Sequence, residues 1–434
     1  MRSGASPRDV GRLALQALPV LAAEPLYVLV DTAVVGRLGA VPLAGLAVAG
    51  VLFAQVTTAL NFLSYGTTAR SARLHGAGRR SEAVVEGVQA TWVALAVGLL
   101  VLGVGQLVAR PVADALGDGG PVADAAVGWL RIALFGAPLI LVTLAGNGWM
   151  RGVQDTARPL RYVLAGNAFS AVLCPVLVHV VGWGLEGSAV ANVAAQVIVA
   201  ALFLRALLRE GVPLRPRFDL IRAQLSMGRD LILRTAGFQA CFLSATAVAA
   251  RFGASSVAAH QIVLQLWNFQ ALVLDAVAIA AQALVGAALG AGGADRAKVV
   301  GAQVTRYGLW LGIGFGVLFA ALYPVLPAVF TADPEILATV PQAWWFFVAL
   351  QPVAGVVFAI DGVLLGAGDA AFLRTTTLAA ALLGFLPLIW ISLVAGWGLV
   401  GIWTGLAMFM LVRFVAVGLR ARSGRWAVTG AVRG

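Results

Sequence analysis

Apolar runs of about 20 residues recur along the whole chain, and this pattern limits the possible folds more than any other feature of the sequence. A run of that length crosses the hydrocarbon core of a bilayer as an α-helix, whereas membrane-spanning strands are shorter and alternate in polarity. Only 11% of the 434 residues are charged, against about 25% in a typical soluble domain. The sequence therefore predicts an all-α integral membrane protein.

The apolar runs predict twelve transmembrane helices. They cover residues 12–36, 44–70, 84–109, 122–150, 158–180, 184–208, 222–250, 257–287, 299–330, 336–365, 374–395 and 397–419. The first run is too long for a signal peptide, and no short apolar core leads into a small-residue cleavage site. We therefore expect it to be retained as the first span.

The formal charge of +11 at first suggests a nucleic-acid partner, but the placement of the basic residues argues against one. Basic residues gather before the first predicted span, after the second, fourth and eighth spans, in the centre of the chain and at its end. The opposite connections hold little beyond Arg37, Arg110 and Arg251. This positive-inside bias predicts a multi-pass protein of the cytoplasmic (inner) membrane, with both termini in the cytoplasm and arginines that contact anionic lipid.

The two halves of the chain repeat each other at a constant shift. "DTAVVGRLGAVPLA" from Asp31 matches "ATAVAARFGASSVA" from Ala245, and Gly148 and Gly152 match Gly362 and Gly366. An even number of spans in each copy predicts parallel repeats, related by an axis along the membrane normal. We expect a six-helix lobe at 1–211, a cytoplasmic linker at 212–221 and a second six-helix lobe at 222–434, an arrangement suited to alternating access.

Acidic residues interrupt the first apolar run. Glu24, Tyr27 and Asp31 recur at steps of three and four residues, so they share one face of a helix. A carboxylate in hydrocarbon is costly, and its removal from water favours the protonated form. This stripe predicts an ion-coupling site that binds and releases a proton. The alternatives are an acid at the membrane interface or a buried hydrogen bond to a neighbouring helix.

Further polar residues lie within or near the predicted spans and are candidates for a substrate cavity, although any of them can also serve to tie helices together. They are Asn61, Asn147, Asn167, Ser170, Asn192, Gln261 and Asp275. Ala245 stands in the second half where Asp31 stands in the first, which assigns the ion chemistry to the first half. Asp275 and Asp361 are alternatives for a second ion site.

Other charged and reactive residues point to structural roles. Asp155 and Asp369 are equivalent in the repeat and lie beside Arg158 and Arg374, which predicts ion pairs at helix ends. Cys174 and Cys241 form no disulfide framework, and the three histidines form no ligand cluster, so we expect no metal and no cofactor. The chain also lacks a nucleophile elbow and a phosphate-binding loop, which argues against an enzyme.

Five ordered stretches resemble the multidrug and toxin extrusion (MATE) family, in particular its DinF-like branch. These stretches are "EPLYVLVDTAVVGRLG", "RGVQDTARPL", "AAHQIVLQLW", "AAQALVGAALGAG" and "DGVLLGAGDAAFLR". The resemblance implies twelve helices in two six-helix lobes that form a V around a central cavity. It also implies cation-coupled export of organic compounds, with Asp31 at the family's proposed protonation site.

The sequence departs from that family's pattern at two places. Gln16 stands where a proline is expected, and Pro19 follows three residues later. In the fifth span, Cys174 precedes Pro175 at the position where the family often carries an acid or amide. The acidic partner sometimes proposed for the span-one aspartate is therefore missing, which leaves Glu24 and Tyr27 as candidate companions of Asp31.

Taken together, these features predict a monomeric secondary exporter of small organic compounds, cationic or amphipathic, driven by protons or, as the less favoured option, by sodium. Tryptophans such as Trp149, Trp267, Trp344 and Trp345 can stack on cations. One alternative is a lipid-linked oligosaccharide flippase, which Arg229, Arg234 and Arg306 would suit. A major-facilitator transporter is less favoured, since "ARLHGAGRR" lacks the expected acid, and a non-transport membrane protein is a further alternative.

Overall fold

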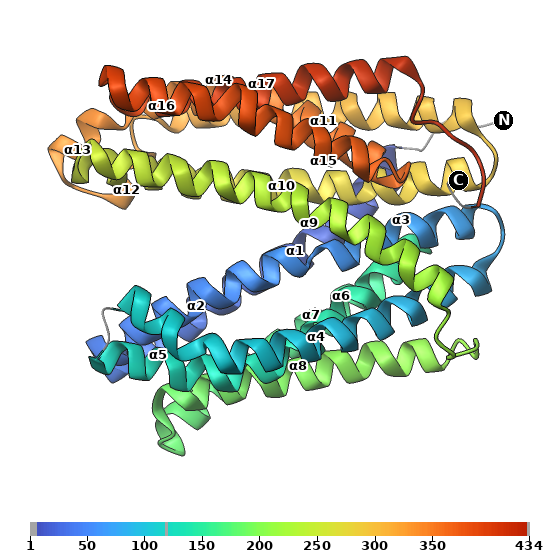
Figure 1. The fold of residues 1–434 in the computed structure, drawn as a ribbon, viewed down its shortest axis with the longest axis horizontal. Coiled ribbons are helices and arrows are strands. Elements are labelled where there is room, and N and C mark those ends of the chain that lie inside the picture. The colour runs from blue at the N-terminus through green and yellow to red at the C-terminus, as the bar shows by residue number, and fades with distance from the viewer. Residues whose placement is uncertain (1–6, 118–119, 432–434) are drawn as a thin grey trace. The chain divides into compact units, whose positions relative to one another are not determined.

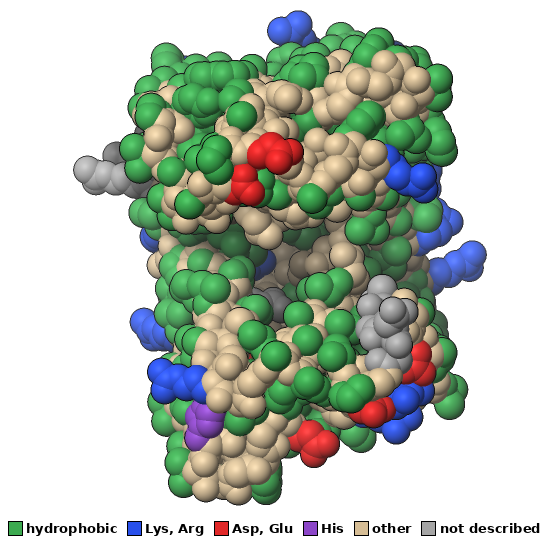
Figure 2. All heavy atoms as spheres, turned by 90° about the vertical axis from the view of Figure 1, so that its left-hand side faces the viewer, with side chains coloured by type: hydrophobic (Ala, Val, Ile, Leu, Met, Phe, Trp, Pro, Cys, Tyr) green, Lys and Arg blue, Asp and Glu red, His purple; other side chains and the backbone are tan. Residues whose placement is uncertain are grey.

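The computed structural model is helical throughout the part of the chain that it describes, residues 7–117 and 120–431 apart from the side chains of residues 7–9, 24, 116 and 117. Twelve of its helical segments are long and apolar enough to cross a membrane, and no strand occurs among the described residues. The prediction of an all-α protein with twelve transmembrane helices is therefore confirmed. Figure 2 shows hydrophobic side chains over much of the visible face and only scattered charged ones.

The chain divides into two compact units, Leu15–Gly228 and Met1–Ala14 with Arg229–Gly434 (Figure 1). The first half of the chain contains α1 (Pro7–Val35), α2 (Ala40–Leu60), α3 (Phe62–Gly76), α4 (Arg80–Gly117), α5 (Gly120–Ala133), α6 (Ala137–Gly152), α7 (Ala157–Pro175) and α8 (Gly184–Leu208). Short 3₁₀ segments follow α1 (η1, Gly36–Leu38) and α5 (η2, Leu134–Gly136), and a π-helical segment follows α7 (η3, Val176–Val180).

The second half contains nine α-helices within the described residues. They are α9 (Phe218–Arg251), α10 (Ala254–Gly290), α11 (Ala294–Leu322), α12 (Leu326–Phe330), α13 (Pro334–Thr339), α14 (Pro341–Gly366), α15 (Ala370–Ala379), α16 (Leu386–Ala395) and α17 (Gly398–Ser423), with a π-helical segment η4 (Ala380–Phe385) between α15 and α16. In Figure 1, α10, α11, α14 and α17 run side by side, in agreement with their mutual packing.

Between the ninth and tenth spans, two predicted span ends differ from the structure. The helix expected over 299–330 ends at Leu322, and the following span begins at Pro341 rather than at 336. Pro324 and Pro327 explain the first difference, because proline lacks the backbone N–H that would continue the helix and its ring clashes with the preceding turn. Hydropathy alone does not detect this interruption, since the residues on both sides of it are apolar.

Glycines allow matching helix pairs to pack closely in the two halves. A Cβ on Gly148 of α6 would lie 2.9 Å from the backbone oxygen of Ser64 in α3. A Cβ on Gly362 of α14 would lie 2.3 Å from the backbone oxygen of Ala278 in α10. These two contacts occupy equivalent positions in the repeat. Small residues permit such close approach, which is the main source of packing energy between helices in lipid.

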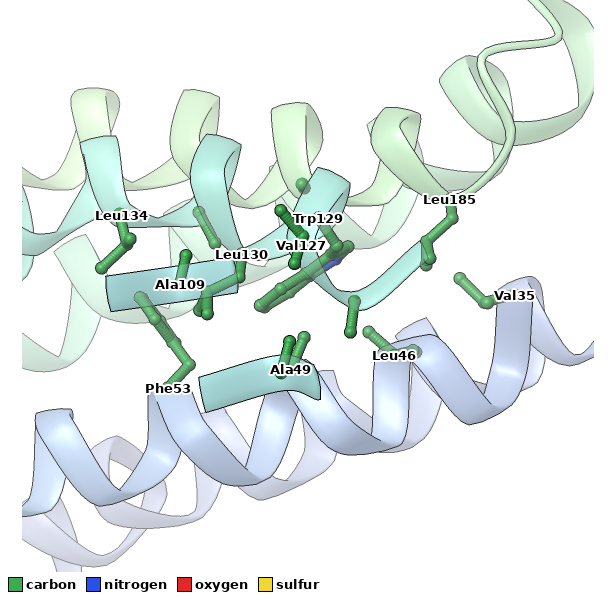
Figure 3. Close-up of a cluster of buried hydrophobic side chains, with 14 residues drawn as sticks. Val35, Leu46, Ala49, Phe53, Ala109, Val127, Trp129, Leu130, Leu134 and Leu185 are labelled. Atoms are coloured by element: carbon green, nitrogen blue, oxygen red, sulfur yellow. The ribbon is translucent and has the colours of Figure 1, made fainter. Parts of the chain in front are cut away.

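In the Leu15–Gly228 unit, a buried apolar cluster packs α2 against α5 (Figure 3). Trp129 of α5 is 4% exposed, and its ring meets Phe53 of α2 edge to face, with centroids 5.8 Å apart. Val35, at the end of α1, belongs to the same cluster. The cluster thus anchors the end of the helix that carries Asp31.

Candidate functional site

Asp31 lies inside the Leu15–Gly228 unit, because the face of α1 that carries it is turned inward. Its side chain is 4% exposed, whereas the flanking Val30 and Thr32 face outward. The thiol of Cys174, in the last turn of α7, donates to Asp31 Oδ1 at 3.3 Å. The carboxyl group is therefore enclosed by protein and is held by a donor from a neighbouring helix.

A second helix reaches the same carboxyl group. Ser188 of α8 is fully buried and lies within hydrogen-bonding reach of Asp31. Its own Oγ accepts a hydrogen bond of 3.0 Å from the indole Nε1 of Trp129. Because Trp129 is fixed in the α2–α5 cluster, it positions the hydroxyl of Ser188 beside the acid.

Tyr27 stands one turn before Asp31 on α1 and is 7% exposed. Its phenol interacts electrostatically with Asp31 and lies near the side chains of Ser170 in α7 and Asn192 in α8. The phenolic oxygen nevertheless completes no hydrogen bond among the described residues, and the same is true of Ser170 Oγ. The site therefore combines one buried acid with hydroxyl, thiol and amide groups that can hold or pass a proton.

The local shape of α7 brings Ser170 and Cys174 to the site. They are four residues apart and share one helix face. Pro175 then ends the α-helical segment, and η3 continues as a π-helix, a geometry that occurs often at functional sites. His179 Nε2 lies 3.1 Å from the backbone oxygen of Val34, which ties this segment to the end of α1.

The structure brings together part of the predicted site. Tyr27, Asp31, Ser170 and Asn192 share one environment. The side chain of Glu24 lies outside the described residues. Sequence reasoning missed Cys174, Ser188 and Trp129, and Cys174 was treated only as a departure from a pattern.

The remaining candidates come from α6, α7, α10 and the junction of α2 and α3. Asn61 is exposed at the junction of α2 and α3, Asn167 is half-buried on α7, and Asn147 is buried on α6. Gln261 and Asp275 are half-buried on α10, in the other unit. The assignment of these five side chains to a substrate cavity stays a prediction.

Asp361, one alternative for a second ion site, is an ion-paired residue. It is 4% exposed on α14, and its Oδ2 accepts from Arg234 of α9 at 2.6 Å and from Arg413 of α17 at 2.5 Å. Both guanidinium groups bind Oδ2, so the negative charge of Asp361 is already balanced by cations of the protein. The described residues contain no group of three or more His, Cys, Asp or Glu side chains suited to a metal ion.

The predicted ion pairs at helix ends are found in part. Asp155 pairs with Arg158, as predicted. The prediction for the second half did not anticipate the partners, since Asp369 accepts from Arg420 at 2.8 Å and Arg374 donates to Asp230 at 2.7 Å. These contacts join helices that are distant in the sequence, so the partners could not be predicted from residues that are neighbours in the sequence.

The fold and the buried acid define a polytopic membrane transporter, and comparison with known proteins identifies the family. The MatE family model matches residues 19–176 and again 231–391, once in each half. The chain therefore belongs to the MATE family of transporters and is not an enzyme, and the resemblance found in its sequence is confirmed.

Individual relatives agree with this assignment. The chain is 34% identical to Protein DETOXIFICATION 44, chloroplastic, of Arabidopsis thaliana, over 96% of this chain and 83% of the relative. It is 28% identical to DNA damage-inducible protein F of Escherichia coli (strain K12), over 94% and 92% of the two chains. A crystal structure of MATE in the bent conformation superposes with a TM-score of 0.89 at 20% sequence identity, over 97% of this chain and 95% of that one. At this identity, the match supports the fold alone.

Proposed function

We propose that this transporter exports small organic compounds, cationic or amphipathic, in exchange for protons, and that Asp31 is the proton-binding group. The observation that carries the proposal is the burial of Asp31 among Cys174, Ser188 and Tyr27, because a carboxyl group removed from water changes charge at a large energetic cost. Binding a proton there therefore has a strong effect on the helices around it.

In the proposed cycle, the ionised carboxylate attracts the substrate, and protonation removes that attraction. Substrate leaves on the outer side, and the proton is released on the inner side after the transporter changes conformation. Pro19 and Pro25 lie inside α1 and remove two of its backbone donors, so they are the points at which this helix bends. Such a cycle requires that proton and substrate each prefer one of the two states.

We further propose that the protein is a monomer of the inner membrane, with lobes 1–211 and 222–434 joined by a linker at 212–221 and with both termini in the cytoplasm. The alternation of connections rich and poor in arginine and lysine supports this topology. A flippase for lipid-linked oligosaccharides is less favoured, because Arg229 and Arg234 each pair with a carboxylate and offer less charge to a pyrophosphate.

The test uses proteoliposomes that contain a fluorescent organic cation, with either a pH gradient or a sodium gradient imposed. We expect the pH gradient alone to drive dye flux, and we expect Asp31→Asn to abolish both the flux and the accompanying proton movement. Asp124→Asn, which removes an exposed acid from the same unit, serves as the control and should retain both. Unchanged transport in Asp31→Asn, or flux driven only by sodium, would overturn the proposal.

A further inference from the structure

The linker between α8 and α9 is extended, and α4 holds its backbone. Residues 211–217 have no regular secondary structure, and the buried side chain of Gln89 in α4 binds them. Its amide Nε2 donates to the backbone oxygen of Arg215 at 3.1 Å, and its Oε1 accepts from the backbone N–H of Arg217 at 2.7 Å. One side-chain amide thus takes the place of a neighbouring strand.

Other features also reduce the number of free backbone groups in the linker. Trp92 of α4 donates through its indole Nε1 to the backbone oxygen of Leu214 at 2.9 Å. Pro213 and Pro216 carry no backbone N–H and so need no acceptor. A backbone whose polar groups are paired or missing can lie where water is scarce. The linker is therefore suited to a position at the edge of a bilayer.

The part of α4 that holds the linker lies at the edge of the apolar layer. α4 has 38 residues and is about 57 Å long, so it extends beyond a hydrocarbon core of about 30 Å. Arg110 forms exposed ion pairs with Asp114 and Asp124 and marks one boundary of that core. Trp92 precedes Arg110 by about 27 Å along the helix axis and therefore lies at the other boundary. Tryptophan is common at such interfaces, and Trp92 is 43% exposed.

The outer surface of the linker and of the first turns of α9 is partly apolar. Leu214 is 45% exposed, and Phe218, the first residue of α9, is 79% exposed. Phe218, Arg222 and Leu225 recur at steps of four and three residues, so they lie along one exposed face of α9. Aromatic and aliphatic side chains at this depth can insert among lipid acyl chains, which removes their apolar surface from water.

Positive charge accompanies these apolar side chains. The stretch 209–222 contains five arginines and two acids. Glu210 is already bound by one arginine of α4 and one of α7, and Asp219 forms only an exposed pair with Arg217 at 3.0 Å. Guanidinium groups match the oxygens of phosphate, and a membrane surface rich in anionic lipid attracts basic segments. The excess positive charge of the linker is therefore placed to meet lipid phosphates.

We propose that the linker and the first turns of α9 form an interfacial anchor that binds anionic phospholipid. Leu214, Phe218 and Leu225 enter the acyl region, while Arg215 and Arg217 bind the phosphate groups. In the topology proposed above, the anchor lies on the cytoplasmic leaflet. The connection between the two halves of the chain is then a segment fixed to α4 and to the membrane surface, and not a free tether in water.

The experiment measures the depth of position 218 in the full-length protein, reconstituted in nanodiscs of phosphatidylcholine and phosphatidylglycerol. Phe218→Cys carries an apolar nitroxide label, and its collisions with oxygen, which enters lipid, are compared with its collisions with a water-soluble nickel complex. Arg79→Cys, at an exposed position just before α4, provides the aqueous reference. Cys174 and Cys241 are buried, and the unsubstituted protein controls for their labelling.

We expect the oxygen-to-nickel collision ratio at position 218 to be at least fivefold higher than the ratio at position 79. Equal ratios would place the linker in water, where it would be open to a soluble protein, and would overturn the proposal.

Lipid composition tests the role of the arginines, with the label kept at position 218. In nanodiscs of phosphatidylcholine alone, the collision ratio should fall at least twofold, and glycerol 3-phosphate in solution should not restore it. Arg215→Gln combined with Arg217→Gln should abolish this dependence on phosphatidylglycerol. The control pair, Arg422→Gln with Arg425→Gln, changes two exposed arginines near the end of the chain and should keep the dependence. A ratio that does not depend on lipid, or that the soluble phosphate restores, would overturn the binding of anionic phospholipid.

Gln89→Leu tests whether α4 positions the anchor, because it removes both hydrogen bonds of this side chain to the linker backbone. The collision ratio at position 218 should fall at least twofold. Gln106→Leu is the control, since it loses a bond to a backbone oxygen at the other end of α4, and it should leave the ratio unchanged. Size-exclusion chromatography monitors folding, and Trp92→Phe, which loses the bond to Leu214, replaces Gln89→Leu if that variant does not fold.

An unchanged ratio in the folded variant would overturn the role of α4 in holding the anchor. None of these measurements depends on transport, so failure of lipid binding and failure of proton-coupled export are observed separately.

Discussion

The thiol of Cys174 donates a hydrogen bond to the carboxylate of Asp31 at 3.3 Å and joins two helices whose residues are 143 positions apart. Both side chains are buried, at 0% and 4% exposure. A thiol is a weak donor, so this contact holds the carboxylate in place at a small energetic cost and releases it easily when it becomes protonated. Cysteine is thus a reasonable neighbour for an acid that must change its charge.

Removal of the thiol should weaken this arrangement. Cys174→Ala is expected to slow export about threefold to tenfold, as the loss of about 1 kcal/mol predicts, whereas Cys174→Ser keeps a donor and should keep most of the activity. Cys241→Ala, at the other buried cysteine, is the control. Dye export from proteoliposomes provides the measurement, and equal rates for the alanine and serine variants would contradict a role for the hydrogen bond.

Trp129 has two separable functions, packing and hydrogen bonding. Trp129→Phe keeps a ring in the α2–α5 cluster but loses the bond to Ser188, so we expect a loss of about 1 kcal/mol in stability. Trp129→Ala also creates a cavity and should cost about 3–5 kcal/mol. Thermal unfolding in detergent distinguishes the two variants. The control is Trp183→Phe, at an exposed position, which should not change stability. Similar losses of stability in Trp129→Phe and Trp129→Ala would show that the hydrogen bond, and not the packing of the ring, dominates.

Glu86 and Glu82 lie one turn apart on α4 and differ in environment. Glu86 is 1% exposed and accepts from Arg70 at 2.6 and 2.8 Å and from Gln224 at 2.8 Å. Glu86→Ala leaves Arg70 without this partner and should cost about 3–5 kcal/mol. Glu82→Ala removes an exposed pair with Arg79 and should change stability by less than about 1 kcal/mol. Unfolding in a denaturing detergent measures both, and equal effects would refute the distinction.

Glu210 should make stability depend on pH. The guanidinium of Arg80 donates to Glu210 and lowers the pKa of that carboxyl group below its ordinary value, with a further contribution from Arg158. A lowered pKa in the folded state stabilises the protein above the unfolded value of about 4.5, and this contribution is lost as the pH falls through the lower folded pKa. At pH 7 we therefore expect the free energy of unfolding of wild type to exceed that of Glu210→Gln by about 1 kcal/mol. The difference is small because the Arg80–Glu210 pair is partly exposed.

The difference in stability between wild type and Glu210→Gln should decline as the pH falls below about 4.5 and should disappear once the pH is below the lowered folded pKa. It should also shrink in high salt, which screens exposed charges. Melting temperatures recorded for both proteins across this pH range provide the test. A difference that stays constant with pH would mean that Glu210 contributes through packing rather than through its charge.

The sequence alone was sufficient for the class, the number of spans and the internal repeat. Span length and hydropathy are local properties, and a bilayer leaves few folds available to a chain with so many apolar runs. Asp31 was also identifiable, because a carboxyl group within such a run is energetically exceptional. Its companion Tyr27 followed from helix periodicity, which is again local.

The tertiary structure alone decided which groups surround these residues. Cys174 and Ser188 reach Asp31 from α7 and α8, and Arg234 and Arg413 reach Asp361 from α9 and α17. Each of these contacts depends on how helices rotate and pack, which is determined by many small steric fits such as those at Gly148 and Gly362. A single sequence specifies the face on which a side chain lies, but the neighbour that it meets there is fixed only when the helices pack.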